Sequence, residues 1–295
     1  MSLSVGIVGL PNVGKSTLFN ALLKKQVAYV ANFPFATIEP NVGVVPVPDE
    51  RLGKLAAIYQ APIVPAAVKF VDIAGLIKGS SQGDGLGNKF LSHIREVDAI
   101  LYLLRDFKDE NVIRAGSVEP EKDLEILQME LELADLDAKE EVNLLAKKPK
   151  IVVYNTDEHR LNEDGLRICA KLEAELAELS EREQKEYLEQ LGIAKTGLEK
   201  VIQSAFEILG LQTFLTAGTK EVRAWTLRRG DTALRASGVI HTDFMKKFIK
   251  AEVVNFEDFV KVGGWKRARE LGKMRLEGRD YVMQEGDVVE FKIGS

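Results

Sequence analysis

Residues 5–25, VGIVGLPNVGKSTLFNALLKK, decide the fold of this chain. A short apolar run opens the stretch, GLPNVGKS follows at residues 9–16, and a helical pattern closes it. The middle part fits G-x-x-x-x-G-K-[ST], and this phosphate-loop motif requires a strand before it and a helix after it. The stretch therefore predicts the first strand, loop and helix of a P-loop nucleotide-binding domain.

The loop predicts how phosphate groups are held. Its glycines allow backbone N–H groups to converge on phosphate oxygens, in front of the positive end of the following helix. Lys15 is expected to contact the β- and γ-phosphates, and the hydroxyl of Ser16 is expected to bind Mg²⁺. The nucleotide-binding residues predicted in this loop and the first helical turn are Asn12, Val13, Gly14, Lys15, Ser16 and Thr17.

A second group of residues predicts the metal site and the switch segments. Asp72 ends the strand VKFVD and can hold a magnesium-bound water. Thr37, in FPFATIEPN, lies between the phosphate loop and Asp72 in the chain, where a switch threonine would complete the magnesium shell. Gly75 can donate its backbone N–H to the γ-phosphate, and the Gly- and Ser-rich residues 75–88 predict a switch segment.

The residue after Gly75 bears on catalysis. Ras-type enzymes have a glutamine there that orients the attacking water, whereas this chain has Leu76, which can neither donate nor accept a hydrogen bond. Hydrolysis is therefore slow, or another group positions the water. A monovalent cation such as K⁺ near Asn12 is one candidate for the missing positive charge. The catalytic set predicted from the sequence is Lys15, Gly75 and Leu76.

The stretch YNTDE, residues 154–158, predicts which base is bound. A GTPase has Asn-Lys-x-Asp at such a position, and its Asp accepts both donors of the guanine edge. Here Thr156 replaces the Lys and Glu158, one methylene longer, replaces the Asp, so the guanine-reading contacts are disabled. Asn155 can still brace the phosphate loop. We expect adenine, read by backbone groups near Glu158; a plain acidic helix start is the alternative.

Composition bounds the class of protein. The chain has 295 residues, enough for one large domain or two, and 45% of them are hydrophobic. The net charge of −5 does not mark the whole chain as a nucleic-acid binder. One cysteine, Cys169, excludes an internal disulfide and fits a reducing compartment. No stretch reads as a signal peptide or membrane helix, so we expect a cytoplasmic protein.

Two modules are predicted. Residues 211–295 contain 16 Lys and Arg against 12 Asp and Glu, a net +4, so the rest of the chain carries −9. Residues 1–210 alternate apolar runs with helical patterns and predict a parallel α/β sheet of the P-loop type. Within them, residues 121–148 read as a packing helix or as the remnant of a helical arm. Residues 211–295 predict a small α+β module with strands at 220–227, 281–283 and 287–293 and a helix near 242–250.

Taken together, these motifs closely resemble the YchF/Obg-like ATPases, in the translation-factor-related branch of P-loop proteins. Residues 6–22, 31–46 and 70–91 resemble the phosphate, switch I and switch II motifs of that family. TAGTKEVRAWT, GVIHTDF and EGRDYVMQEGDVVEF resemble its C-terminal TGS module, which has a β-grasp-like fold. ICAK, residues 168–171, resembles its final base-side loop, which adds Cys169 and Ala170 to the expected nucleotide site.

The resemblance implies a function. It suggests a slow ATPase that prefers ATP to GTP, has a hydrophobic residue in place of the catalytic glutamine, and associates with ribosomes. The expected partners are Mg²⁺, ATP and the ribosome, either its large subunit or the whole particle, and we expect a monomer. An Obg-type GTPase and a non-hydrolysing nucleotide sensor that acts by binding proteins are the alternatives. Leu76 favours the sensor.

The chain also departs from the family pattern. Members usually carry a long helical coiled-coil arm before the base-reading strand, and only residues 121–148 are available for it here. Ten residues separate Glu158 from Cys169, where the family has a helix and a strand. Either the arm has been largely lost or segments are missing from the sequence.

The C-terminal module has two basic stretches, KKFIK at residues 246–250 and WKRARELGKMR at residues 265–275. Such clusters are candidates for contacts with the phosphates of rRNA. Trp265, beside Lys266 and Arg267, could stack on an exposed base. The alternative is a solvated helix face with Trp265 in the core.

Overall fold

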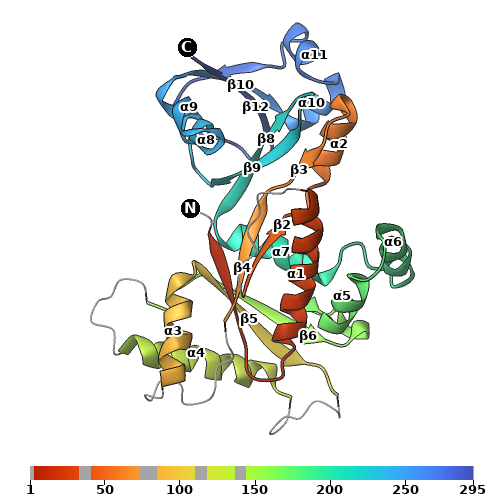
Figure 1. The fold of residues 1–295 in the computed structure, drawn as a ribbon, viewed down its shortest axis with the longest axis vertical. Helices are drawn as coiled ribbons and strands as arrows, with labels where there is room; N and C mark the ends of the chain where they lie inside the picture. Colours follow the sequence, from red (N-terminus) through yellow and green to blue (C-terminus); the bar gives the residue numbers. More distant parts are fainter. Residues whose placement is uncertain (1–2, 33–40, 74–84, 110–117, 137–143, 295) are drawn as a thin grey trace. The chain divides into compact units, whose positions relative to one another are not determined.

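The computed structural model describes residues 3–32, 41–73, 85–109, 118–136 and 144–294. The chain forms two compact units, each with its own six-stranded sheet (Figure 1). Unit 1 consists of Met1–Pro46 and Val68–Leu209, and unit 2 of Val47–Ala67 and Gly210–Ser295. Among the described residues, no helix is both long enough and apolar enough to span a membrane.

The sheet of unit 1 has the strand order β2-β4-β1-β5-β6-β7. These strands are β2 (Val42–Pro46), β4 (Ala67–Asp72), β1 (Ser4–Val8), β5 (Ala99–Asp106), β6 (Lys150–Thr156) and β7 (Leu166–Ile168). The pairings of β1 with β4 and β5, of β5 with β6 and of β6 with β7 are all parallel. The carboxyl ends of these strands therefore meet at one edge, which is where open α/β sheets bind ligands.

Helices cover both faces of this sheet. On one face, α3 (Gly85–Glu96) and α4 (Pro120–Leu136) pack against β5 and β6 through a buried apolar cluster that includes Ile94, Leu127 and Tyr102. Helix α1 (Lys15–Asn32) lies on the other side, next to α5 (Ala170–Leu176), as Figure 1 shows. Helix α7 (Gly197–Ile208) packs against β6 and β7.

The charged stretch at residues 171–192 forms two helices. A capping box at Ser180 and Glu183 starts α6 (Glu181–Gln190) after α5. Thr196 caps α7, with Glu199 completing a second capping box, and Gly210 follows the helix at φ 66°. Local capping signals thus determine the boundaries of these helices.

The helical insertion is shorter than predicted. Helix α4 ends at Leu136, and residues 137–143 lie outside the described part of the chain. Beyond these residues, Leu145 is fully buried. The carboxylate of Asp135 accepts the N–H groups of Leu145 and Ala146, both at 2.9 Å, and so closes this short connection.

Unit 2 has the strand order β11-β10-β12-β8-β9-β3. Its strands are β3 (Ile63–Val64), β8 (Leu211–Ala217), β9 (Val222–Arg228), β10 (Phe248–Asn255), β11 (Arg275–Glu277) and β12 (Asp287–Ile293). Helix α8 (Ala233–Ile240) packs against β9 and β10. The antiparallel pair β8 and β9, with β12 parallel to β8, confirms the β-grasp-like arrangement.

Three details of unit 2 differ from the prediction. Residues 47–67, expected in the first module, belong to unit 2, because α2 (Glu50–Tyr59) packs on β8 and β9 and β3 pairs with β9. Residues 281–283, expected as a strand, form only an isolated bridge from Val282 to Thr232. The helix near 242–250 is only α9 (Thr242–Lys246), because Phe248 already begins β10.

The last part of unit 2 contains α10 (Phe256–Val262) and α11 (Trp265–Glu270). Trp265 is a packing residue here: its indole Nε1 donates to the carbonyl of Ala217 at 3.0 Å, and its ring meets Phe259 edge-on at 5.0 Å between centroids. Its backbone N–H donates to the hydroxyl of Tyr59 at 3.2 Å. These contacts favour the alternative of a packed indole over base stacking for Trp265.

Candidate nucleotide site

The phosphate loop runs from the end of β1 at Val8 to the start of α1 at Lys15. Two residues of the loop have left-handed backbone conformations, Asn12 with φ 63° and Gly14 with φ 94°. A Cβ at Gly14 would be strained and would collide with the side-chain amide of Asn155, so only glycine fits. A Cβ at Gly9 would lie 2.7 Å from the carbonyl oxygen of Leu103, so the loop also needs glycine where it crosses β5.

The loop opens into a cavity of about 700 Å³ at the carboxyl edge of the sheet. Its walls come from the loop and the first turn of α1, from residues 107–109 after β5, from residues 155–157 at the end of β6, and from residues 169–171 at the start of α5. Of the predicted nucleotide-binding residues, those that line it are Asn12, Gly14, Lys15, Ser16, Thr17, Asn155, Cys169 and Ala170. Stretches distant in sequence thus surround one space.

Lys15 and Asp72, predicted for phosphate and metal binding respectively, are in contact. The Nζ of Lys15 forms an ion pair with Oδ1 of Asp72, and the two side chains are only 12% and 20% exposed. Lys15 starts α1 and Asp72 ends β4, the neighbour of β1 in the sheet. The contact therefore places the carboxylate of Asp72, predicted for the metal site, beside the phosphate loop.

Asn155 joins the two sides of the cavity. Its Nδ2 donates to the carbonyl of Val13 in the phosphate loop at 2.9 Å, and its Oδ1 accepts the N–H of Ala170 at 2.9 Å. The residue is only 5% exposed, so both hydrogen bonds are sheltered from water. Val13 is itself buried and contributes to the site through this backbone carbonyl. The predicted bracing role of Asn155 has a defined geometry here.

Cys169 precedes α5 as its N-cap residue and is buried. Burial raises the pKa of its thiol above the ordinary value, with the nearby charges of Glu158 and Asp157 acting in the same direction. The sulfur is therefore protonated at neutral pH and is not poised for nucleophilic chemistry. Cys169 lines the cavity, and it lies in residues 168–171, the ICAK stretch predicted as the base-side loop.

At the end of β6 the cavity is lined by Thr156 and Asp157. Glu158 begins a single turn of 3₁₀ helix, Glu158–Arg160, and is not among the residues that line the cavity. The hydroxyl of Thr156 is engaged, since its Oγ1 donates to the carbonyl of Asp106 at 3.2 Å.

Sequence reasoning missed the residues after β5. Phe107 and Lys108 line the cavity, and Lys171 lines it from α5. The buried Arg105 holds the loop, since its guanidinium donates to the carbonyls of Phe107 and Asp109, both at 3.3 Å, and lies 4.5 Å from the centroid of the Phe107 ring. Only the position of β5 could have identified these residues in advance. Because β5 lies next to β1, its carboxyl end borders the same edge of the sheet.

Three predicted residues lie outside the described part of the chain: Thr37, Gly75 and Leu76. For Mg²⁺, the donors that are described fit the chemistry of a hard cation. A hydroxyl at Ser16 and a carboxylate at Asp72 supply oxygen, and Mg²⁺ in P-loop proteins takes its remaining ligands from phosphates and water. The described residues hold no cluster of three or more His, Cys, Asp or Glu that could bind a metal.

Known proteins share the sequence and the fold of this chain. The chain is 43% identical to the Ribosome-binding ATPase YchF of Haemophilus influenzae, over 99% of both sequences. It belongs to the YchF family. The YchF protein of Bacillus subtilis is 41% identical, again over 99% of both chains. The solved structure of the YchF GTPase of Schizosaccharomyces pombe matches with a TM-score of 0.85 and 32% identity, over 99% of this chain and 98% of that one.

Two family models match separate parts of the chain. The model for the C-terminal YchF domain, described as "Protein of unknown function (DUF933)", matches residues 211–294. The model described as "50S ribosome-binding GTPase" matches residues 4–156. The second match ends at Thr156, so the short 3₁₀ connection and β7 follow it.

The chain is shorter than its YchF relatives. The alignment with the Haemophilus influenzae protein extends over 366 positions, and this chain has 295 residues, so at least 71 positions have no counterpart here. Shortening accords with the structure, in which Asp135 closes the connection after α4 and nine residues, 157–165, join β6 to β7.

Proposed function

We propose that this chain is a slow ATPase that switches conformation with its nucleotide and docks on the ribosome. One observation carries the proposal most strongly: the phosphate loop, Lys15 and the Asn155 bridge surround one cavity at the carboxyl edge of the sheet. The bacterial relatives are named Ribosome-binding ATPase, which supports both the ATPase activity and the docking on the ribosome. A cytoplasmic place for the protein follows from a ribosomal partner.

The phosphate end of the cavity supports triphosphate binding with Mg²⁺. Lys15 would exchange its ion pair with Asp72 for the β- and γ-phosphates, because phosphate offers more negative charge than one carboxylate. Asp72 would then be free to hold a magnesium-bound water, with Ser16 as a direct ligand. Mg²⁺ would supply charge neutralisation at the phosphates, and Thr37 is the proposed third contributor.

Adenine over guanine is the proposed preference at the base end. Glu158 does not line the cavity and the hydroxyl of Thr156 is engaged by Asp106, so neither provides guanine's paired contacts. Thr156 and Asp157 line this end of the cavity, and Phe107 lines it from the loop after β5. Selection of guanine requires buried acceptors matched to its two donors, and these two side chains do not supply them.

Slow turnover is proposed from Leu76, which replaces the water-orienting glutamine. Gly75 is the proposed γ-phosphate sensor, with Lys15 stabilising the developing charge. K⁺ near Asn12 is the proposed source of additional positive charge at the phosphates. The alternative to slow hydrolysis is that the chain binds the nucleotide as a sensor and does not hydrolyse it.

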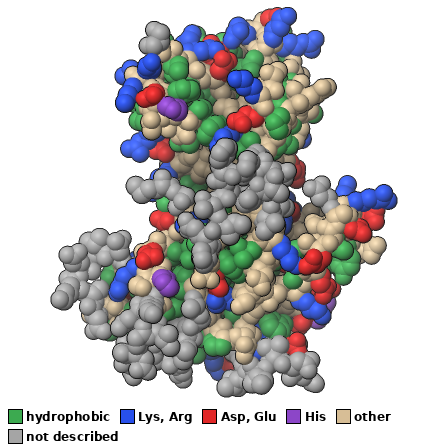
Figure 2. Space-filling model, viewed as in Figure 1, with side chains coloured by type: hydrophobic (Ala, Val, Ile, Leu, Met, Phe, Trp, Pro, Cys, Tyr) green, Lys and Arg blue, Asp and Glu red, His purple; other side chains and the backbone are tan. Residues whose placement is uncertain are grey.

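The ribosome contact is proposed to involve unit 2, the TGS-like module. Lys247, Lys266 and Arg267 are exposed and form no ion pair among the described residues, so their charge is available to phosphates. Figure 2 shows Lys and Arg side chains over much of the visible face of this unit. The proposed partner surface is rRNA or ribosomal protein, and the protein is proposed to act as a monomer.

Single-turnover hydrolysis tests the proposal. Excess chain is mixed with labelled ATP and Mg²⁺, in K⁺ and in Na⁺, and phosphate release is followed. A slow release that K⁺ accelerates supports an ATPase with a cation in place of the glutamine. Tight ATP binding without release in either salt would show a sensor instead.

A further inference from the structure

A charged network at the base side of the cavity ties three strand ends together. Asp106 is the last residue of β5, Arg160 ends the 3₁₀ turn after β6, and Arg167 lies in β7. The Oδ1 of Asp106 accepts from Nη1 of Arg160 at 2.9 Å, and its Oδ2 forms an ion pair with Nη1 of Arg167. One carboxylate thus reaches across the end of β6 to a strand that is not its neighbour in the sheet.

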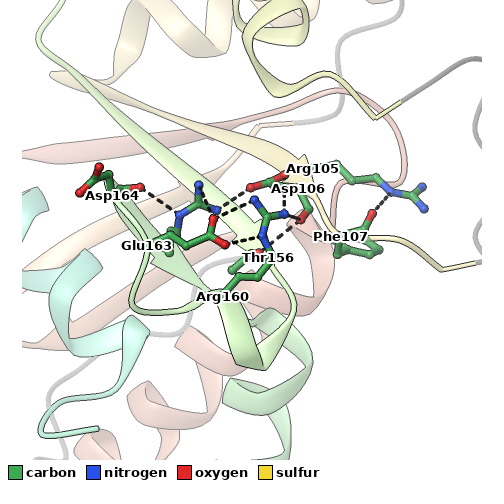
Figure 3. Close-up of polar contacts among 8 residues, drawn as sticks. Arg105, Asp106, Phe107, Thr156, Arg160, Glu163 and Asp164 are labelled. Carbon is green, nitrogen blue, oxygen red and sulfur yellow. Dashed lines mark hydrogen bonds and ion pairs between the residues drawn. The ribbon is translucent and has the colours of Figure 1, made fainter.

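Further contacts complete the network, as Figure 3 shows. Glu163 accepts from Nε and Nη2 of Arg160 at 2.9 Å and 2.8 Å, and lies 3.3 Å from Nη2 of Arg167. The backbone carbonyl of Asp106 accepts from Arg160 at 3.0 Å and from the hydroxyl of Thr156 at 3.2 Å. Bidentate, charge-assisted pairs of this kind fix geometry as well as contributing energy.

The ion pair between Asp106 and Arg167 is largely shielded from solvent. The side chains of Asp106 and Arg167 are 13% and 10% exposed, so their ion pair is only weakly screened. Burial alone would raise the pKa of Asp106, but hydrogen bonds and charge from Arg167 and Arg160 lower it overall, so the carboxylate is ionised at neutral pH. The guanidinium of Arg167 also lies 5.0 Å from the centroid of the Tyr154 ring.

The loops that follow these strands are the base-side walls of the cavity. Residues 107–109 follow β5 directly after Asp106, residues 156 and 157 end β6, and residues 169–171 follow β7. Strand β7 is a three-residue strand at the edge of the sheet, and its connection to β6 contains only one 3₁₀ turn. So short an edge strand needs support beyond its own ladder.

We propose that Asp106, acting through Arg160 and Arg167, is a positioning residue that sets the spacing of the base-side loops and thereby the affinity for the nucleotide base. Among the described residues, no hydrogen bond or ion pair joins the network to the phosphate loop or to Asp72, so we expect its effect at the base end. The inference rests on the proposed function, because it assumes that the cavity binds a nucleotide. It adds to that function a set of residues that governs base affinity separately from phosphate binding.

The test compares two probes that share the phosphate site and differ in the base. ATP affinity is measured by titration, and the affinity for inorganic triphosphate by competition with a fluorescent ATP analogue, both with Mg²⁺. Asp106→Asn retains the shape but removes the charge, and it should weaken ATP binding about five- to tenfold, the loss on the order of one hydrogen bond. Inorganic triphosphate should bind within about twofold of wild type.

Three further variants sharpen the result. Arg160→Gln should reproduce the selective loss, and the loss in the double variant should be smaller than the sum of the two single losses, since both changes remove the Asp106–Arg160 pair. Arg182→Gln is the matched control, because Arg182 forms an exposed ion pair with Glu186 on α6, away from the cavity. It should change neither affinity.

The outcomes separate the inference from the function. Wild-type chain that binds neither probe would overturn both. Wild type that binds ATP, with both variants binding it equally well, would overturn the inference alone. Equal weakening of both probes would also overturn it, because that pattern indicates general loosening of the unit and not positioning of the base. If Asp106→Asn does not fold, Arg160→Gln decides between the same outcomes.

Discussion

The side-chain amide of Asn155 holds the carbonyl of Val13 and the N–H of Ala170 at once, each at 2.9 Å. It therefore connects the phosphate loop to the loop before α5. Asn155→Ala would leave a buried donor and a buried acceptor unpaired, which costs about 1–3 kcal/mol for each group. We expect a lower melting temperature and ATP affinity reduced by at least about tenfold, measured by thermal unfolding and titration.

A matched control separates stability from binding. Asn255 caps α10 in unit 2 by accepting the N–H of Glu257 at 2.9 Å. Asn255→Ala should lower stability by about 1 kcal/mol and leave ATP affinity unchanged. If the Asn155 variant bound ATP as well as the Asn255 variant does, the bridge would have no role in the nucleotide site.

Lys15 is predicted to be indispensable for phosphate binding. Lys15→Ala removes the only predicted phosphate-binding cation of the loop, and we expect affinity for ATP and for GTP alike to fall by roughly two orders of magnitude. Lys24→Ala on the same helix is the control, because Lys24 pairs with Glu178 and does not line the cavity. Titration of both variants with both nucleotides checks the expectation, and loss for one nucleotide only would contradict it.

Glu173 predicts a pH dependence of stability. It is 4% exposed, and burial raises its pKa above the ordinary 4.5, although hydrogen bonds from Leu198 and Gly197 oppose this. The folded chain therefore holds this proton more tightly than the unfolded chain. Its contribution to the free energy of unfolding is largest below pH 4.5 and is lost as pH rises through the folded pKa.

Glu173→Gln should remove that slope. The difference in free energy of unfolding between wild type and the variant, measured by denaturant titration at several pH values, should shift in favour of the variant as pH rises above 4.5. The exposed Glu183 has a pKa lowered by hydrogen bonds from Ser180, so Glu183→Gln should show a shift of opposite sign. A pH-independent difference for Glu173 would show that its burial does not perturb its ionisation.

The basic surface of unit 2 is predicted to dock on the ribosome. Reversing Lys266 and Arg267 to Glu should weaken co-sedimentation with ribosomes and flatten its dependence on salt. Arg269 is a poorer target than the sequence suggested, because it forms an ion pair with Glu252 at 2.9 Å and its reversal would disturb the fold. Reversal of the exposed Arg182 and Lys185 on α6 is the control, and an equal effect of both pairs would contradict a specific surface.

Much of unit 1 could be predicted from the sequence, because its signals are local. The phosphate-loop motif and the Thr196 cap each depend on residues within a few positions of one another. The membership of residues 47–67 in unit 2 depends on pairing of β3 with β9, more than 150 residues away, and no local pattern encodes it. The wall at Phe107 and the inward position of Asp157 likewise depend on how strands end side by side.

The Asp106 network shows the same limit at the site. Its three charged residues are spread over 62 positions, from 106 to 167, and look like ordinary surface charges in the sequence. Only the parallel order of β5, β6 and β7 brings them together. Glu158, predicted among the nucleotide-binding residues, begins a 3₁₀ turn and does not line the cavity, whereas Asp157 does.

The most direct test of the account is a pair of titrations of the wild-type chain, with ATP and with GTP, in Mg²⁺ and K⁺. The account predicts that ATP binds at least about fivefold more tightly, because neither Thr156 nor Glu158 offers guanine its paired contacts. Equal affinities, or tighter binding of GTP, would contradict it. In that case Asp157→Ala and Asp109→Ala would identify the carboxylate that reads guanine, since both acids line the cavity.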